Sequence, residues 1–363
     1  MQFIHETQTV WQLLTQTHKP IVLYGMGDGA LKILRVCKEY DIAVSDIFAS
    51  DGFVRGHSFE GYRVKTLSEI QALYPDFIIL VAFAVHDEPM MRRLYELSTR
   101  YELYVPDVPV AGEGLFTLDY AHEHEAELER VYGLLADEQS RLVFSSVLNY
   151  KISGKTSYLK ACTTEKDEAY RALIKPRQDE YYVDLGAYDG DTIRELLSYT
   201  GGEFERITAF EPDAKNYKKL LNKLAESLPE QDFQRVLALN IGAHNEKTTL
   251  YFEGRAGRNS ALAQNAQAKH VMPVSVNSVD AILNGGKATL IKLDVEGAEH
   301  PALLGCADTI RRCAPRLIVS AYHRNEDLFD LPLLVHALNP EYRLYLRHHP
   351  YIPAWDTNLY ALP

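Results

Sequence analysis

Strand-like and helix-like segments alternate along this chain in two separate blocks, and this alternation constrains the fold more than any other feature. Short apolar runs with β character are followed by segments of helical periodicity, a pattern that predicts a parallel sheet covered by crossover helices. The expected strands of the second block cover residues 181–185, 207–210, 235–240, 288–293, 317–320, 342–347 and 358–361. The last two follow one another without a helix, so the block predicts an open seven-stranded α/β sheet with an antiparallel terminal hairpin.

Helices of the second block are expected where apolar periodicity follows a capping residue. The first covers residues 192–199, with Asp191 or Thr192 as its cap, and a later one covers residues 298–312. Extra strands or arms are expected at residues 248–252 and 271–276.

The first block, between residues 20 and 107, repeats the alternation on a smaller scale. Ser68 is expected to cap a helix that runs to Tyr74. Strands are expected at residues 21–24, 44–49 and 77–83. Three strands with crossover helices predict a small Rossmann-like unit.

The length of the chain, 363 residues, exceeds the about 250–300 residues at which a single core stops growing. Proline and glycine follow the first block, and a long connecting helix is expected over residues 118–150, with an irregular stretch over residues 153–177. The predicted organisation is an N-terminal Rossmann-like domain (1–107), a helical linker (108–178) and a C-terminal α/β domain (179–363).

Charge and cysteine content argue against several classes of protein. The formal net charge is −12 and no Lys/Arg run is long enough for a basic patch, so we expect no nucleic-acid partner. The four cysteines lack CxxC spacing and are expected to be reduced thiols. The longest apolar run, residues 77–85, is far shorter than the about 20 residues of a membrane-spanning helix, and a signal-peptide pattern is absent. We therefore expect a cytoplasmic protein of undetermined oligomeric state.

The strongest chemical motif is VDLGAYDGDT, where a buried strand runs into a glycine turn and then a helix. Glycine lets the backbone turn sharply and approach a ligand, and ligands of open α/β sheets bind at the carboxyl ends of strands. The acidic residues would repel a pyrophosphate, but they suit the cationic methionine part of S-adenosylmethionine. The candidate cofactor residues of this turn are Asp184, Gly186, Ala187, Tyr188, Gly190, Asp191 and Thr192.

Two further acidic residues end later strands. Glu211, followed by Pro212, lies about 20 residues after the glycines, where a carboxylate can accept hydrogen bonds from both ribose hydroxyls. Asp294 ends the strand expected to abut the first one, which would place it near the reactive methyl group. The alternative for Glu211 is a surface carboxylate, and the alternative for Glu299 is an acidic residue that stabilises a helix N-terminus.

The blocks VDLGAYDGDT, AFEPD, NIGAHN, PVSVNSVDAIL and IKLDVEGAE occur in this order, and in them the chain resembles the FkbM family of methyltransferases. The resemblance covers about residues 179–363. It implies a class I methyltransferase fold, S-adenosylmethionine as methyl donor, and a hydroxyl acceptor on a sugar, glycan or secondary metabolite. It also implies that Asn240, Ile241 and Gly242 lie by the adenine.

Asp294 and His323 are the candidate general bases, because each follows a strand that ends at the expected cleft. Glu296 is the third candidate catalytic residue. A metal held by these three side chains is an alternative, but a hydrogen-bonding role for His323 is preferred and no metal ligand is assigned. His348 and His349 are expected at the surface or at the pocket rim.

The N-terminal segment from Gly25 to Ala30 fits the dinucleotide-binding pattern G-x-G-x-x-A. This unit is similar to the small Rossmann-like domains of sugar-modifying acetyltransferases, which implies a nucleotide or nucleotide-sugar ligand; a purely structural role is equally open. Two other functions stay open: a nicotinamide-dependent oxidoreductase, and a non-catalytic binding or scaffold protein that retains a methyltransferase fold.

Overall fold

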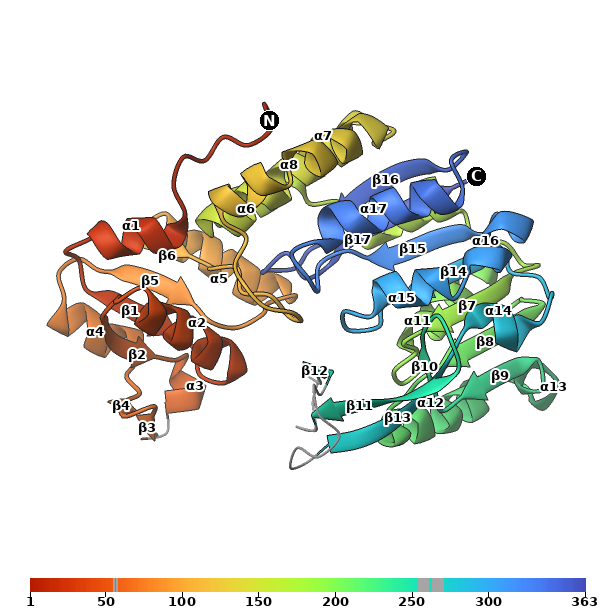
Figure 1. Ribbon diagram of the computed structural model, residues 1–363. Helices are drawn as coiled ribbons and strands as arrows, with labels where there is room; N and C mark the ends of the chain where they lie inside the picture. The colour runs from red at the N-terminus through yellow and green to blue at the C-terminus, as the bar shows by residue number, and fades with distance from the viewer. Residues whose placement is uncertain (55, 57, 254–260, 263–270) are drawn as a thin grey trace.

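The computed structural model describes residues 1–54, 56, 58–253, 261–262 and 271–363. A parallel sheet and a larger, mostly parallel sheet lie at opposite ends of the molecule, and the helices α7 (Glu125–Leu134) and α8 (Glu138–Ser153) run across the top between them (Figure 1). The mixed α/β fold predicted from the sequence is confirmed.

The C-terminal sheet has seven strands in the order β16-β17-β15-β14-β7-β8-β9. Strand β14 pairs in parallel with β7 and β15, and β17 pairs antiparallel with β15 and β16, so the predicted terminal hairpin is confirmed. Because the central strands are parallel, the loops after β7, β8, β14 and β15 meet at one edge of the sheet. The strands are β7 (Tyr181–Leu185), β8 (Arg206–Phe210), β9 (Val236–Leu239), β14 (Leu290–Leu293), β15 (Arg316–Ser320), β16 (Arg343–His348) and β17 (Thr357–Leu362).

The helices of this half differ from the prediction at two places. Helix α11 begins at Asp191 and its cap is Gly190 in a left-handed conformation, so neither Asp191 nor Thr192 is the cap. The single helix expected over residues 298–312 is two helices, because Asp280 pairs with both sides of the break. Its N–H donates to the Gly305 carbonyl at 2.9 Å, and its carboxylate accepts from the Thr309 N–H at 2.8 Å. The helices are α11 (Asp191–Thr200), α12 (Ala214–Ser227), α13 (Glu230–Phe233), α14 (Val279–Leu283), α15 (Glu299–Leu304), α16 (Ala307–Cys313) and α17 (Asp327–Leu338).

The extra strands expected beside the main sheet are confirmed as a separate small sheet in the order β10-β13-β11-β12. Strands β11 and β13 pair antiparallel and extend away from the main sheet at the lower middle of Figure 1. The strands are β10 (Gly242–Ala243), β11 (Thr248–Glu253), β12 (Ala261–Leu262) and β13 (Val271–Asn277).

The N-terminal half contains a parallel sheet in the order β2-β1-β5-β6, as expected of a Rossmann-like unit. Its fourth strand was not predicted, because Glu102–Tyr104 is short and begins with a charge. Thr66, and not Ser68, caps helix α4. The elements are α1 (Val10–Gln16), β1 (Ile21–Tyr24), α2 (Asp28–Glu39), β2 (Val44–Phe48), α3 (Asp51–Val54), β3 (Ser58–Phe59), β4 (Tyr62–Arg63), α4 (Leu67–Leu73), β5 (Ile78–Val81), α5 (Glu88–Ser98) and β6 (Glu102–Tyr104).

The connecting region is more helical and more broken than predicted. The expected helix over residues 118–150 is three helices, with breaks at His124 and after Leu134. At the second break the Ala136 N–H donates to the Leu344 carbonyl of β16 at 2.8 Å. Residues 153–177, expected to be irregular, are also mainly helical. The elements are α6 (Leu118–Glu123), α7, α8, α9 (Thr156–Cys162), α10 (Lys166–Ala169) and the π-helical turn η1 (Tyr170–Ile174).

One hydrophobic cluster contains side chains from all three predicted segments, including Val81, Phe144 and Leu346. His348 and His349 are buried, so their expected surface position is wrong. His349 contacts the Thr164 carbonyl at 2.8 Å through Nδ1, which joins the connecting helices to the terminal hairpin.

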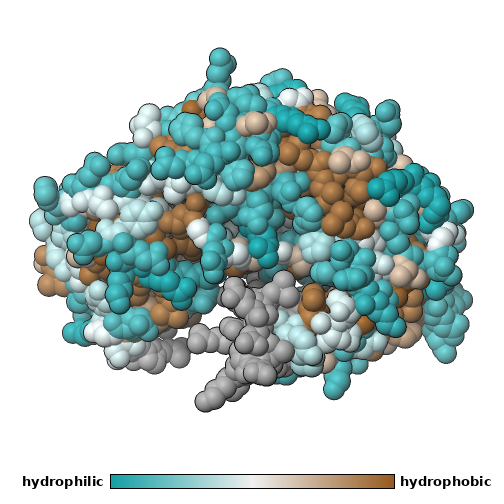
Figure 2. All heavy atoms as spheres, in the orientation of Figure 1, coloured by the Kyte–Doolittle hydropathy of each residue, from teal (hydrophilic) through white to brown (hydrophobic). Residues whose placement is uncertain are grey.

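The outside of the molecule is mainly hydrophilic on the face in Figure 2, with an apolar patch where α15 and α17 lie. Among the residues that the structure describes, no helix is long and apolar enough to span a membrane.

Candidate functional site

The glycine turn after β7 is packed directly against the end of β14. A Cβ atom on Gly186 would lie 1.9 Å from the Asp294 carbonyl oxygen, and Gly186 has φ +85°, so only glycine fits this position. The Asp294 N–H donates to the Leu185 carbonyl at 3.0 Å. The predicted cofactor turn and the predicted catalytic carboxylate are therefore neighbours in the structure.

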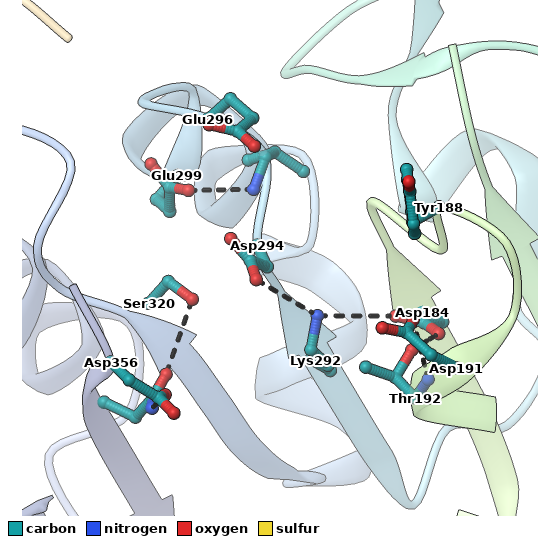
Figure 3. Close-up of polar contacts among 12 residues, drawn as sticks. Asp184, Tyr188, Asp191, Thr192, Lys292, Asp294, Glu296, Glu299, Ser320 and Asp356 are labelled. Carbon is teal, nitrogen blue, oxygen red and sulfur yellow. Dashed lines mark hydrogen bonds and ion pairs between the residues drawn. The ribbon is translucent and has the colours of Figure 1, made fainter. Parts of the chain in front are cut away.

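Asp184 lies at the end of β7 and is fully buried. Its Oδ2 accepts a hydrogen bond from the Thr192 hydroxyl, and the Lys292 Nζ lies 3.9 Å from Oδ1 (Figure 3). Burial raises the pKa of the Asp184 carboxyl above its ordinary value, and Lys292 opposes that shift. The Oδ1 atom has no hydrogen-bond partner among the described residues.

Glu211 ends β8 beside the glycine turn, as its spacing predicts. Its two carboxylate oxygens accept hydrogen bonds from the backbone N–H groups of Tyr188 and Asp213, each at 2.8 Å. Burial raises its pKa to about 7, although both backbone bonds oppose the shift. Each oxygen keeps a second lone pair, so the carboxylate can still accept hydrogen bonds from a ligand.

The segment expected by the adenine follows β9. The Asn240 side chain donates to the Glu211 and Pro212 carbonyls at 2.9 and 3.0 Å, so its amide holds the turn that carries Glu211. Ile241 and Gly242 are half-buried, and Gly242 packs against Val276 of β13. Asn240 thus acts on the shape of the site through the backbone.

The opposite side of the site is built from charged side chains. Asp294 receives a hydrogen bond from the Tyr322 hydroxyl at 3.2 Å. Its Oδ2 lies 3.6 Å from the Lys292 Nζ (Figure 3). Burial acts to raise the pKa of Asp294, but Lys292 and then His323 outweigh it, so the pKa is lowered. Asp294 therefore carries a negative charge near neutral pH.

His323 is buried among carboxylates. Its Nε2 lies 3.6 Å from Asp294 Oδ1 and 3.5 Å from Glu296 Oε2, and its Nδ1 lies 3.0 Å from a Glu299 oxygen. Burial alone would lower the pKa of His323, but the carboxylates, Glu299 first among them, outweigh burial and raise it well above its ordinary value. The structure brings together all three predicted catalytic residues.

Three side chains of this cluster were not assigned from the sequence: Lys292, Tyr322 and Glu299, the last interpreted only as a helix N-terminal residue. Lys292 carried a readable signal, since a lysine inside the apolar strand Leu290–Leu293 must be paired when buried. Burial lowers its pKa, but Asp294 and Asp184 outweigh burial and leave the pKa raised. Tyr322 and Glu299 gave no comparable signal.

A segment from the predicted linker packs against this cluster. The Ala111 N–H donates to the His323 carbonyl at 2.8 Å, and a Cβ atom on Gly297 would lie 2.6 Å from the Ala111 Cβ. Arg324 donates to the Gly297 carbonyl at 2.7 Å and so joins the loops after β14 and β15.

Comparison with known proteins relates the C-terminal half of the chain to methyltransferases by sequence and the whole chain to one solved structure by fold. Residues 184–353 match the family profile described as Methyltransferase FkbM domain. No curated protein matches the sequence. The crystal structure of a methyltransferase FkbM from Methylobacillus flagellatus matches over 99% of this chain and 94% of its own, with a TM-score of 0.76 and 23% identity.

Two other methyltransferase structures match only about half of this chain. An rRNA methylase from Streptococcus thermophilus is 13% identical over 54% of this chain and 93% of its own, with a TM-score of 0.33. Aeropyrum pernix fibrillarin, solved with S-adenosyl-L-methionine, is 12% identical over 51% of this chain and 67% of its own, also at 0.33. These scores are too low to establish a common fold. Residues 184–353 thus match the FkbM methyltransferase domain, and the chain as a whole has the fold of one solved FkbM methyltransferase.

Proposed function

We propose that this protein transfers a methyl group from S-adenosylmethionine to a hydroxyl oxygen of a sugar, glycan or other small molecule. One observation carries the proposal: the glycine turn, the ribose-type carboxylate Glu211 and the charged Asp294 all lie at the carboxyl edge of β7, β8 and β14. The match of residues 184–353 to the FkbM methyltransferase domain supports it.

The cofactor would lie along the turn between Gly186 and Gly190. Glu211 would accept hydrogen bonds from the ribose hydroxyls, and Ile241 and Gly242 would face the adenine. The Oδ1 atom of Asp184, which makes no hydrogen bond to the residues that the structure describes, would offer an acceptor to the methionine part. Backbone groups would form most of this cofactor site, so few charged side chains would contact the cofactor.

The acceptor hydroxyl would bind on the Asp294 side. Its oxygen attacks the methyl carbon, the carbon–sulfur bond breaks, and the sulfonium becomes the neutral thioether of S-adenosylhomocysteine. The hydroxyl proton passes to the Asp294 carboxylate, which is charged near neutral pH. The raised pKa of His323 means that its imidazole already holds a proton, so we assign it, with Glu296, to positioning Asp294 and the acceptor.

Isothermal titration calorimetry tests the cofactor assignment. We expect binding of S-adenosylmethionine and S-adenosylhomocysteine with one site per chain, and no binding of NAD. Tight NAD binding without binding of either sulfur nucleoside would support the oxidoreductase alternative and refute the proposal. Incorporation of label from methyl-labelled cofactor into a panel of hydroxylated glycans and small molecules then tests the acceptor class.

A further inference from the structure

We infer that Asp294, Glu299 and His323 form a binding site for one divalent metal ion on the acceptor side of the cleft. The catalytic use of this metal rests on the proposed function, but its binding does not. One ligand atom from each of these three side chains lies within 4.8 Å of the others. Metal–ligand distances are about 2.0–2.4 Å, so a single ion can contact two ligand atoms that lie up to about 4.8 Å apart.

Two buried atoms of the cluster lack partners among the described residues, and they point to a missing ligand. Glu299 Oε1 accepts the Val295 N–H at 2.8 Å, but Oε2 has no hydrogen bond. His323 Nδ1 lies 3.0 Å from Glu299 Oε1 as an ion pair, but it too has no hydrogen bond among the described residues. Unpaired polar atoms in a buried position are costly, and a cation bound to both side chains would satisfy them.

The charges of the cluster also favour a cation. Three carboxylates, Asp294, Glu296 and Glu299, surround one imidazole. Lys292 lies near Asp294, but it also lies near Asp184. Its positive charge is therefore shared between two carboxylates and does not by itself offset the negative charge of the cluster. A divalent ion bound to His323 would take the place of one imidazole proton and offset two negative charges, one more than the imidazolium does.

The exposure of the ligands distinguishes a catalytic site from a purely structural one. The side chains of His323 and Glu299 are 2% and 0% exposed, whereas those of Asp294 and Glu296 are 33% and 48% exposed. One side of the ion would thus be closed and the other open to water or to an acceptor oxygen. Two carboxylates and one imidazole suit Mn²⁺ or Mg²⁺, and a bound ion would lower the pKa of a coordinated hydroxyl.

Binding of Mn²⁺ to the metal-stripped full-length protein, measured by electron paramagnetic resonance in the absence of cofactor, tests this site. We expect one Mn²⁺ per chain, and at least tenfold weaker binding in Asp294→Asn and in Glu299→Gln. His300→Ala is the matched control, because His300 pairs with Asp330 outside the cluster. This variant should bind Mn²⁺ as the unaltered protein does.

The outcomes separate the metal site from the proposed function. No Mn²⁺ binding at millimolar concentration, or unchanged binding in a folded Asp294→Asn variant, overturns the metal site. Asp294 is partly exposed, so this variant remains informative if Glu299→Gln does not fold. If the unaltered protein binds cofactor but no Mn²⁺, the metal site alone is refuted, whereas Mn²⁺ binding without any cofactor binding refutes the methyltransferase proposal.

Discussion

The two sides of the candidate site hold their carboxylates in different ways. On the cofactor side, Glu211 is fixed by two backbone N–H groups, and Asp184 is held by a hydroxyl from the next helix. On the acceptor side, Asp294, Glu299 and His323 face one another, and Glu299 Oε2 and His323 Nδ1 make no hydrogen bond within the described part of the chain. Backbone contacts define a shape for binding, whereas a cluster of charged side chains provides groups for chemistry, so substitutions on the two sides should have separable effects.

The largest effect is expected from Asp294→Ala. Removal of a positioned base should lower the rate of methyl transfer by about 10²–10⁴-fold, while the dissociation constant of S-adenosylmethionine changes by less than about threefold. Single-turnover assays with an identified acceptor, together with calorimetry, measure both quantities. Tyr322→Phe keeps the carboxylate and removes only one hydrogen bond to it, so its rate loss should be smaller. A parallel loss of cofactor affinity in Asp294→Ala would remove the distinction between the two sides.

The second-largest effect concerns the contact between the glycine turn of the cofactor side and Asp294 of the acceptor side. Gly186→Ala places a Cβ atom against the Asp294 carbonyl in a left-handed backbone, and we expect a loss of about 3 kcal/mol or more in the free energy of unfolding. Gly201→Ala is the matched control, since Gly201 has φ +69° but nothing within 4 Å of the added atom. It should lose only about 1 kcal/mol. If urea unfolding gives equal losses of unfolding free energy for the two variants, the contact between Gly186 and the Asp294 carbonyl has room for a Cβ atom.

Substitution of Glu211 should act on binding alone. Glu211→Gln keeps an oxygen for one backbone N–H but loses the charge, and each charge-assisted bond to ribose is worth about 1.5–3 kcal/mol. We expect the dissociation constant of S-adenosylmethionine to rise roughly 10–100-fold in calorimetry. Asp213→Asn, a neighbouring helix cap, should bind normally. Unchanged affinity in a folded Glu211→Gln protein contradicts the ribose assignment.

The raised pKa of Glu211, about 7, predicts a pH dependence of binding. Ribose hydroxyls donate to the charged carboxylate, so binding favours deprotonation and affinity rises as pH increases through the pKa. Between pH 6 and pH 8 we expect affinity to increase by about tenfold, with a plateau above. The Glu211→Gln protein should show a flat profile over this window. If the affinity of the Glu211→Gln protein still increases with pH, the increase is caused by the titration of another group.

The smallest effect is expected from Asn240→Ala. Its amide acts through the Glu211 and Pro212 carbonyls, so its loss should loosen the turn without removing a cofactor contact. We expect the affinity for S-adenosylmethionine to fall by about two- to tenfold, in line with a net loss of roughly 0.5–1.5 kcal/mol. A larger loss than in Glu211→Gln would mean that Asn240 contacts the cofactor itself.

Local signals predicted most of the C-terminal fold. Apolar runs and glycine turns mark the seven strands, and the spacing from Gly186 to Glu211 correctly predicts that the turn and the carboxylate meet. The errors occur where distant segments touch. One expected helix is divided at Gly305 because Asp280 pairs with both sides of the break, and the long connecting helix is broken after Leu134 where Ala136 pairs with β16.

The sequence by itself determined which strand ends carry acidic groups, because a strand, a glycine turn and a helix are specified by neighbouring residues. Only the tertiary structure decided what those groups face. Lys292 lies between Asp184 and Asp294 because β7 and β14 are adjacent, and Glu299 lies against His323 because the loops after β14 and β15 converge. Charge and burial at such a cluster depend on contacts between segments far apart in the chain, which no local pattern encodes.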